Sequence, residues 1–161
     1  MSAPARNGVI RRAVLHNIGV VAVGFAVALA GARLDTLRSR RAFRSTLTRV
    51  AGLVLLASGF LLRTWATTCF YEHRMKVVVL HPQGNLVTTG PFSLSRNPLY
   101  LGGNVFIFFG ASLLLGTRMG LILTALHLPV VDLMVRREER QLDARFGPEW
   151  RAYRSRVRRW L

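Results

Sequence analysis

Four long apolar stretches divide the sequence, and they constrain its fold more than any other feature. They cover Ala13–Ala32, Val50–Leu62, Leu99–Leu115 and Met119–Met134, and they carry almost no charged residues. Each is close to the length of about 17 to 25 residues with which a helix crosses the hydrocarbon core of a bilayer. The pattern predicts an all-α, polytopic integral membrane bundle of about four transmembrane helices. It excludes an ordinary soluble globule, a disordered tail and a disulfide scaffold.

The charged residues lie mainly outside these stretches, with 23 Lys and Arg against 7 Asp and Glu and a formal net charge of +16. In a soluble chain such a charge would suggest a nucleic-acid binder, but those proteins spread their apolar residues in amphipathic patterns. Since the apolar residues are concentrated in blocks here, we expect the lipid bilayer as a partner and no nucleic acid. No set of His, Cys, Asp and Glu has the spacing of metal ligands.

We interpret residues 1–161 as a single membrane domain, with an N-terminal helix and an arginine-rich connector over 1–49 and a core over 50–161. The first apolar stretch is longer than the core of a signal peptide, so we expect a retained helix. The positive-inside rule predicts a multi-pass protein of the inner (plasma) membrane, with both termini and the Glu72–Asn97 loop in the cytoplasm. Six arginines between residues 33 and 49 disagree with that orientation, because it sends them outside.

The Glu72–Asn97 loop is longer than an ordinary helix connection, and it contains Pro82, Gly84 and Gly90, so we predict a folded functional segment. Asn97 is a suitable N-cap and Pro98 suits a first helical turn. The third span should therefore begin there, with its free backbone N–H groups and Arg96 forming an anion site. Gly102 and Gly103 would let a ligand approach one turn further on. The alternative is that Asn-Pro only starts a helix and the glycines form a helix-packing seam.

The C-terminal tail begins as a continuation of the fourth helix, which should stop at Gly147-Pro148. Helical spacing places Glu138 on an apolar face, where a carboxylate needs a cation or a ligand hydroxyl as partner. Glu139 falls on the face of Asp132 and Arg136, where Arg136 and solvent could satisfy it. The spacing of Asp132 and Arg136 also suits an ion pair between them. The alternative is an exposed helix held by local ion pairs.

Two strings in the loop and tail carry a family resemblance. The first runs from Gly90-Pro91-Phe92 through Arg96-Asn97-Pro98-Leu99-Tyr100-Leu101-Gly102, and the second from Glu138-Glu139-Arg140-Gln141-Leu142 through Phe146-Gly147-Pro148-Glu149-Trp150 and Tyr153 to Val157-Arg158-Arg159-Trp160. Together they resemble the isoprenylcysteine carboxyl methyltransferases and their phospholipid N-methyltransferase relatives, over roughly Leu61–Leu161. The resemblance implies a methyltransferase-like core that binds S-adenosylmethionine at the cytoplasmic face. Its acceptor would be a lipophilic small molecule, methylated on a carboxylate or an amine.

The resemblance also implies site residues. Asn85, Leu86, Val87, Gly90 and Phe92 would form the wall of the cofactor pocket, and Arg96, Asn97, Pro98, Tyr100 and Gly102 its floor. Glu138 and Glu139 would hold polar groups of the cofactor. Asn85 and Asn97 stand where the prenylcysteine enzymes have His, and Phe92 where they have Tyr. The Asn-Pro form resembles the phospholipid methyltransferases instead.

For catalysis we assign Arg63 and Glu139. Arg63 interrupts an apolar helix, and a charge at that depth usually faces a partner or a cavity. The alternative is that Arg63 snorkels to the interface. Two other functions stay open at this point: an NADPH-dependent membrane reductase of similar architecture, and a non-catalytic membrane protein that retains the fold.

Overall fold

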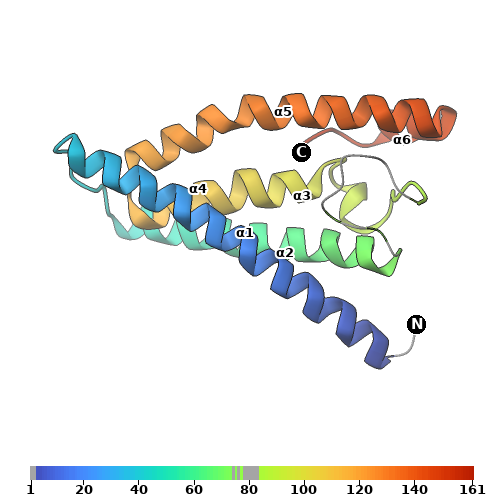
Figure 1. Cartoon of the computed structure of the whole chain (residues 1–161), viewed down its shortest axis with the longest axis horizontal. Helices are drawn as coiled ribbons and strands as arrows, with labels where there is room; N and C mark the ends of the chain where they lie inside the picture. Colours follow the sequence, from blue (N-terminus) through green and yellow to red (C-terminus); the bar gives the residue numbers. More distant parts are fainter. Residues whose placement is uncertain (1–2, 74, 76, 78–83) are drawn as a thin grey trace.

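The computed structural model describes residues 3–73, 75, 77 and 84–161, and this part of the chain is helical with no strand (Figure 1). Four helical stretches are long and apolar enough to cross a membrane, which confirms the predicted all-α membrane bundle. The elements are α1 (Ala3–Leu37), α2 (Thr46–Glu72), the short turn η1 (Gly90–Ser93), α3 (Pro98–Tyr100), η2 (Leu101–Ile107), α4 (Phe108–Leu115), α5 (Arg118–Phe146) and α6 (Pro148–Arg156).

The boundaries follow local signals in the sequence. Ser45 and Thr48 form a reciprocal capping box that starts α2, four residues before the predicted apolar stretch. The third span begins at Pro98 as predicted, although the Asn97 side chain makes no capping hydrogen bond. Over Leu101–Ile107 this span is wound as a π-helix, a form that often occurs at functional sites. As predicted, α5 ends at Phe146, and Gly147 follows with a positive φ of 50°.

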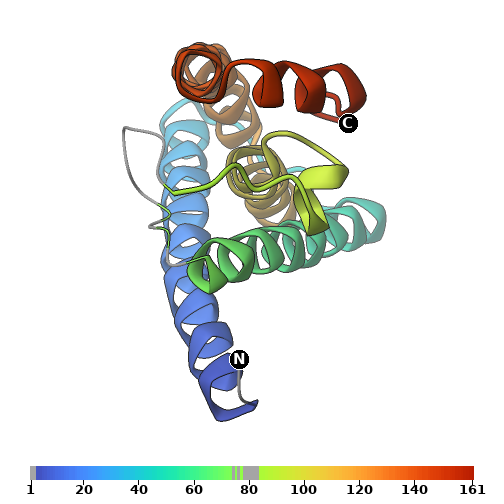
Figure 2. The ribbon, with the colours of Figure 1, turned by 90° about the vertical axis from the view of Figure 1, so that its right-hand side faces the viewer.

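The four spans alternate in direction along the long axis of the molecule. The start of α1, the end of the loop before α3, and α6 lie toward one end, while the 38–45 connector and the turn at Gly116-Thr117 lie at the other (Figures 1 and 2). The loop and the C-terminal tail therefore share one side, as the predicted topology requires. Residues 78–83, which include Pro82, lie outside the described residues.

α2 and the third span pack backbone to backbone. A Cβ atom added to Gly102 would lie 2.8 Å from the Gly59 carbonyl oxygen, and one added to Gly59 would lie 2.6 Å from the Gly102 carbonyl oxygen. The same closeness recurs between Gly52 and Gly110, at 2.9 Å in each direction. Gly102 is thus part of a helix-packing seam, the arrangement expected where helices associate without a hydrophobic driving force between them.

Buried polar groups tie α1 to the rest of the bundle. Asn17 Nδ2 donates to Thr67 Oγ1 on α2 at 3.2 Å. At the other end of α1, the buried Asp35 carboxylate accepts a 2.8 Å hydrogen bond from Thr117 Oγ1 and bonds from the Met119 backbone N–H at the start of α5. A carboxylate is favourable there because the N-terminus of a helix carries a partial positive charge.

α5 packs less tightly against the third span than α2 does. His127 Nε2 on α5 lies 3.0 Å from Asn104 Oδ1 in the π-helical segment. Next to this contact, a cavity of about 530 Å³ separates the two elements. Its lining is almost entirely apolar: Leu101, Val105, Ala125, Leu128, Pro129, Val131, Asp132 and Trp160.

Candidate functional site

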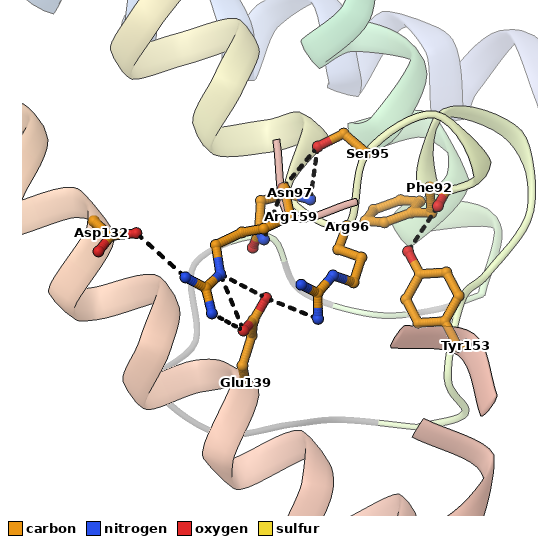
Figure 3. A network of polar contacts seen from close by, with 8 residues as sticks. All are labelled: Phe92, Ser95, Arg96, Asn97, Asp132, Glu139, Tyr153 and Arg159. Atoms are coloured by element: carbon orange, nitrogen blue, oxygen red, sulfur yellow. Dashed lines mark hydrogen bonds and ion pairs between the residues drawn. The ribbon is translucent and has the colours of Figure 1, made fainter. Parts of the chain in front are cut away.

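The loop before α3 and the segment after α6 are joined by a set of hydrogen bonds (Figure 3). The Arg96 backbone N–H donates to the Arg158 carbonyl oxygen at 2.9 Å. Ser95 Oγ and Asn97 Nδ2 both donate to the Arg159 carbonyl oxygen, at 3.0 and 3.2 Å. Asn97 therefore anchors the C-terminal segment instead of capping the helix that follows it.

α6 is fixed to the same loop by Tyr153, whose hydroxyl donates to the Phe92 carbonyl oxygen at 2.6 Å. The side chain is buried against Trp150, with the ring centroids 5.6 Å apart. Burial raises the pKa of Tyr153 well above its usual range. The hydroxyl therefore remains a hydrogen-bond donor over the physiological pH range.

At the centre of these contacts lies an ion cluster of Arg96, Glu139 and Arg159, called the Glu139 cluster below (Figure 3). Arg159 Nη2 lies 2.7 Å from Glu139 Oε2, and Arg159 Nε donates to the same carboxylate at 3.1 and 3.2 Å. From the loop, Arg96 Nη1 lies 3.3 Å from Glu139 Oε1. The Arg96 and Glu139 side chains are each only 8% exposed. Such a pair is retained only where the charges compensate each other.

The electrostatics of the Glu139 cluster differ between its two arginines. Burial lowers the pKa of Arg96, and although Glu139 offsets part of this effect, the positive charges of Arg159 and Arg154 add to it. The hydrogen bond to Glu139 raises the pKa of Arg159. Within the described part of the chain, the buried donors Arg96 Nε and Trp150 Nε1 have no hydrogen-bond partner, and Arg96 Nη1 has only its ion pair with Glu139. Arg96 lies over the Trp150 ring, 5.7 Å from its centroid, so these donors are neighbours.

Glu138 lies in a different polar group from Glu139. Its carboxylate interacts with the Tyr100 hydroxyl, and the charge of Arg63 also acts on Tyr100. Arg63 Nη1 donates to the Leu99 carbonyl oxygen, while Arg63 Nε is buried and has no hydrogen-bond partner in the described ranges. A Cβ atom added to Gly103 would lie 3.0 Å from Arg63 Nη1, so the glycine makes room for the guanidinium.

The loop residues predicted for the pocket wall pack against α2. Val87 and Phe92 are buried with Ala66, and the Phe92 ring stacks on Phe70 with centroids 5.1 Å apart. Gly90 adopts a positive φ of 62°, and a Cβ atom there would lie 3.3 Å from Cys69 Sγ. Leu86 is half-buried, Asn85 is exposed, and Pro98 is buried at the start of α3.

The structure thus sorts the predicted site residues into three neighbouring groups. Arg96 and Glu139 pair within the Glu139 cluster, and Asn97 binds the backbone of Arg159 beside it. Tyr100 interacts with Glu138 and with Arg63, which packs against Gly102. The Phe92 ring belongs with the loop residues along α2, and only its carbonyl oxygen binds Tyr153. The remaining wall residues follow the loop along α2. The predicted Asp132–Arg136 ion pair forms. Glu139, however, is satisfied by Arg96 and Arg159 instead of by Arg136 and solvent.

Arg159, Ser95 and Tyr153 received no role from the sequence, although Tyr153 and Arg159 lie in the string that carries the family resemblance. Arg159 follows Arg151, Arg154, Arg156 and Arg158, and helical or local spacing does not distinguish it from them. Its partner Glu139 is 20 residues away in sequence. The two side chains meet because the chain folds back toward α5 after α6.

Comparison with known proteins agrees with this architecture. The sequence model of the phospholipid methyltransferase family matches residues 47–149. No curated protein and no solved structure matches the chain. The matched region begins in the first turn of α2 and ends within α6, so it contains three of the four spans, the loop, the Arg63, Tyr100 and Glu138 group, and Arg96 and Glu139 of the Glu139 cluster. Arg159, the third member of that cluster, lies after the matched region. Because the match covers more than half of the chain, the protein belongs to the phospholipid methyltransferase family and is a membrane methyltransferase.

Proposed function

We propose that the protein transfers a methyl group from S-adenosylmethionine to a lipophilic acceptor that enters from the bilayer. The observation that carries this proposal is the convergence of the loop and the tail on Glu139. Two segments that are remote in sequence build one buried, charged group at the same end of the bundle as α6. An apolar cavity of about 530 Å³ lies on the neighbouring part of α5.

The residues of the Glu139 cluster fit the amino-acid end of S-adenosylmethionine, which carries an ammonium and a carboxylate. Arg96 Nε and Trp150 Nε1 are buried donors that find no partner among the described residues, and a bound carboxylate could accept from them. Glu139 is a buried carboxylate that could accept from the ammonium. Phe92, Asn97 and Pro98 are the neighbouring pocket residues, and Asn85, Leu86, Val87 and Gly90 would continue the wall along α2.

For the acceptor we propose the apolar cavity between η2 and α5, with the Arg63, Tyr100 and Glu138 group nearby. Leu101 lines the cavity and follows Tyr100 directly. The bound cofactor supplies an electrophilic methyl group, so the protein has mainly to align the acceptor and exclude water. Arg63 would orient an acceptor carboxylate or phosphate, and Glu138 could take a proton from an acceptor amine.

We also propose that the site faces the cytoplasm. The same end of the bundle holds the loop and the tail, and the tail contributes nine arginines from Arg136 onward. The positive-inside rule favours that end for the cytoplasm. Single cysteines at Gly84 and Ser155, in a Cys69→Ser background, should resist an impermeant thiol reagent added outside intact cells. Labelling from outside would reverse the orientation.

The test of the proposed activity has two parts. Lipid extracts from cells with and without the protein are compared by mass spectrometry, and an acceptor that gains one methyl group is expected only with the protein. Purified protein in detergent is then titrated calorimetrically with S-adenosylmethionine and, separately, with NADPH. Binding of NADPH alone would favour a reductase and contradict the proposal.

A matched pair of variants locates the cofactor site. Arg96→Gln removes one charged donor and should weaken S-adenosylmethionine binding about 10- to 100-fold, the effect of losing a charge-assisted hydrogen bond. Arg158→Gln is the control, because that exposed arginine contributes only its backbone carbonyl to the site. Equal affinities in a folded Arg96→Gln protein and the control would exclude the assigned pocket.

A further inference from the structure

A second polar pocket lies on the tail, next to the groups assigned above to the cofactor and the acceptor, and it shares Glu139 and Arg159 with the Glu139 cluster. It has a volume of about 200 Å³ and is lined by Arg136, Glu139, Arg140, Asp143, Arg154 and Arg159. These residues come from three parts of the chain: one face of α5, the exposed side of α6, and the segment after α6. Four guanidinium groups meet two carboxylates there, so positive charge is in excess.

Both carboxylates of this pocket already have cationic partners. Glu139 belongs to the Glu139 cluster, and Asp143 Oδ1 lies 3.2 Å from Arg151 Nη1, which approaches from α6. Arg140 and Arg154 make no ion pair within the described part of the chain, and both are exposed. The charge of Arg154 also acts unfavourably on Arg96. A bound anion would reduce the repulsion among the four arginines of this pocket, whose positive charge exceeds the negative charge of the two carboxylates.

The outer surface of α5 indicates where the pocket lies relative to the hydrocarbon core of the bilayer. Exposed apolar side chains continue along it to Leu133 and Met134, and exposed arginines begin at Arg136. With a rise of about 1.5 Å per residue, Arg136 and Arg140 lie within roughly 10 Å of this change. A hydrocarbon core of about 30 Å within a total of about 40–45 Å leaves a headgroup layer of about 5–8 Å on each side, so Arg136 lies within this layer and Arg140 at its outer edge.

We infer that this pocket binds a phosphate group, and that its natural source is the headgroup of an anionic phospholipid. Guanidinium groups bind phosphate through paired, charge-assisted hydrogen bonds. The volume accommodates a phosphate with several waters, since one water occupies about 30 Å³. Juxtamembrane arginines are in addition attracted to anionic lipid surfaces. Free phosphate has the same chemistry, but the pocket's position at headgroup depth favours the lipid.

The apolar cavity adjoins this pocket and strengthens the choice of a lipid. Asp132 and Trp160 line the cavity, while Arg136 and Arg159, which line the pocket, both pair with Asp132. An amphipathic molecule with its phosphate among the arginines could therefore place a hydrocarbon chain toward the cavity. That cavity is the one proposed above for the acceptor, but binding of phosphate among the arginines does not depend on methyl transfer.

The test compares two double variants that remove the same charge from the same two helices. Arg140→Gln/Arg154→Gln changes the pocket, and Arg137→Gln/Arg156→Gln changes exposed arginines that do not line it. Each full-length protein is purified in detergent, checked for helicity by circular dichroism, and mixed with phosphatidylglycerol or phosphatidylcholine. Bound lipid is counted by native mass spectrometry. Inorganic phosphate is titrated in parallel by calorimetry.

We expect the unmodified protein to bind phosphatidylglycerol at least tenfold more tightly than phosphatidylcholine. The pocket variant should bind phosphatidylglycerol at least tenfold more weakly than the unmodified protein, and the affinity of the control variant should stay within twofold. Binding of inorganic phosphate that the pocket variant loses, without a preference for phosphatidylglycerol, would keep the phosphate site and identify free phosphate as its source. Equal losses in both variants, or no loss in either, would overturn the inference. If the double variant does not fold, Arg140→Gln alone provides the same comparison against Arg137→Gln.

Discussion

The Glu139 cluster gives a sharp prediction about stability, because it contains two side chains that are each only 8% exposed. Glu139→Gln keeps the shape of the side chain but leaves Arg96 without a counter-ion in a buried position. Breaking a buried ion pair in this way typically costs about 3–5 kcal/mol. Asp132→Asn is the matched control on the same helix. Asp132 is 31% exposed, and it pairs with the exposed Arg136 and, at 3.7 Å, with Arg159, so its loss should cost about 1 kcal/mol.

Unfolding in detergent, followed by intrinsic fluorescence, measures both variants at one protein and detergent concentration. The double variant Arg96→Gln/Glu139→Gln completes a double-mutant cycle, and its loss should fall short of the sum of the single losses by about 1–3 kcal/mol. A Glu139→Gln protein as stable as Asp132→Asn would refute this reasoning. The carboxylate would then be solvated, and the bonds to Arg159 would have no net effect.

Three further perturbations follow from other contacts. Gly102→Ala should destabilise the bundle by about 1–3 kcal/mol, because its Cβ would lie 2.8 Å from the Gly59 carbonyl oxygen. Gly8→Ala, whose Cβ would meet no described atom within 4 Å, should have no such cost, and thermal unfolding of both variants checks this. Arg63→Lys should lower turnover and Arg63→Leu should nearly abolish it, with cofactor affinity unchanged in both. Normal turnover in Arg63→Leu would show that the guanidinium has only a structural role, through its hydrogen bond to the Leu99 carbonyl oxygen. The raised pKa of Tyr153 means that the unfolded chain loses this proton first, so folded-state stability should fall as the pH rises above about 10, and Tyr153→Phe should flatten that fall in pH-dependent unfolding.

The sequence predicted the spans well because each is fixed by local properties. An apolar stretch of sufficient length, Pro98 in a first turn and Gly147 at a helix end act within a few residues of where they stand. The apolar stretch Val50–Leu62 nevertheless underestimated the length of α2, which continues past Arg63 to Glu72. Arg63 could be included because the glycines of the third span leave space for it, and that contact lies 40 residues away in sequence.

The contacts within the candidate site could be predicted only in part, because most of them join residues that are remote in sequence. Motif residues Arg96 and Glu139 were selected from the sequence, but their pairing with each other and with Arg159 depends on how the chain returns after α6. Helical spacing correctly separated Glu138 from Glu139. It could not predict that Arg159 would pair with Asp132 and Glu139 on one face of α5. Glu139 is buried there, while Arg136 on the same face stays exposed.

The unequal packing of the spans has a consequence for exchange with the surrounding lipid. α2 and the third span touch through glycine backbones, so this pair has little freedom to separate. α5 instead borders an apolar cavity of about 530 Å³ and exposes Leu126, Val130 and Leu133 on its outer side. A long-chain molecule could leave or enter sideways by exchanging places with neighbouring acyl chains. α2 and the third span would keep their packing during that exchange, and the molecule would enter the protein without bringing water with it.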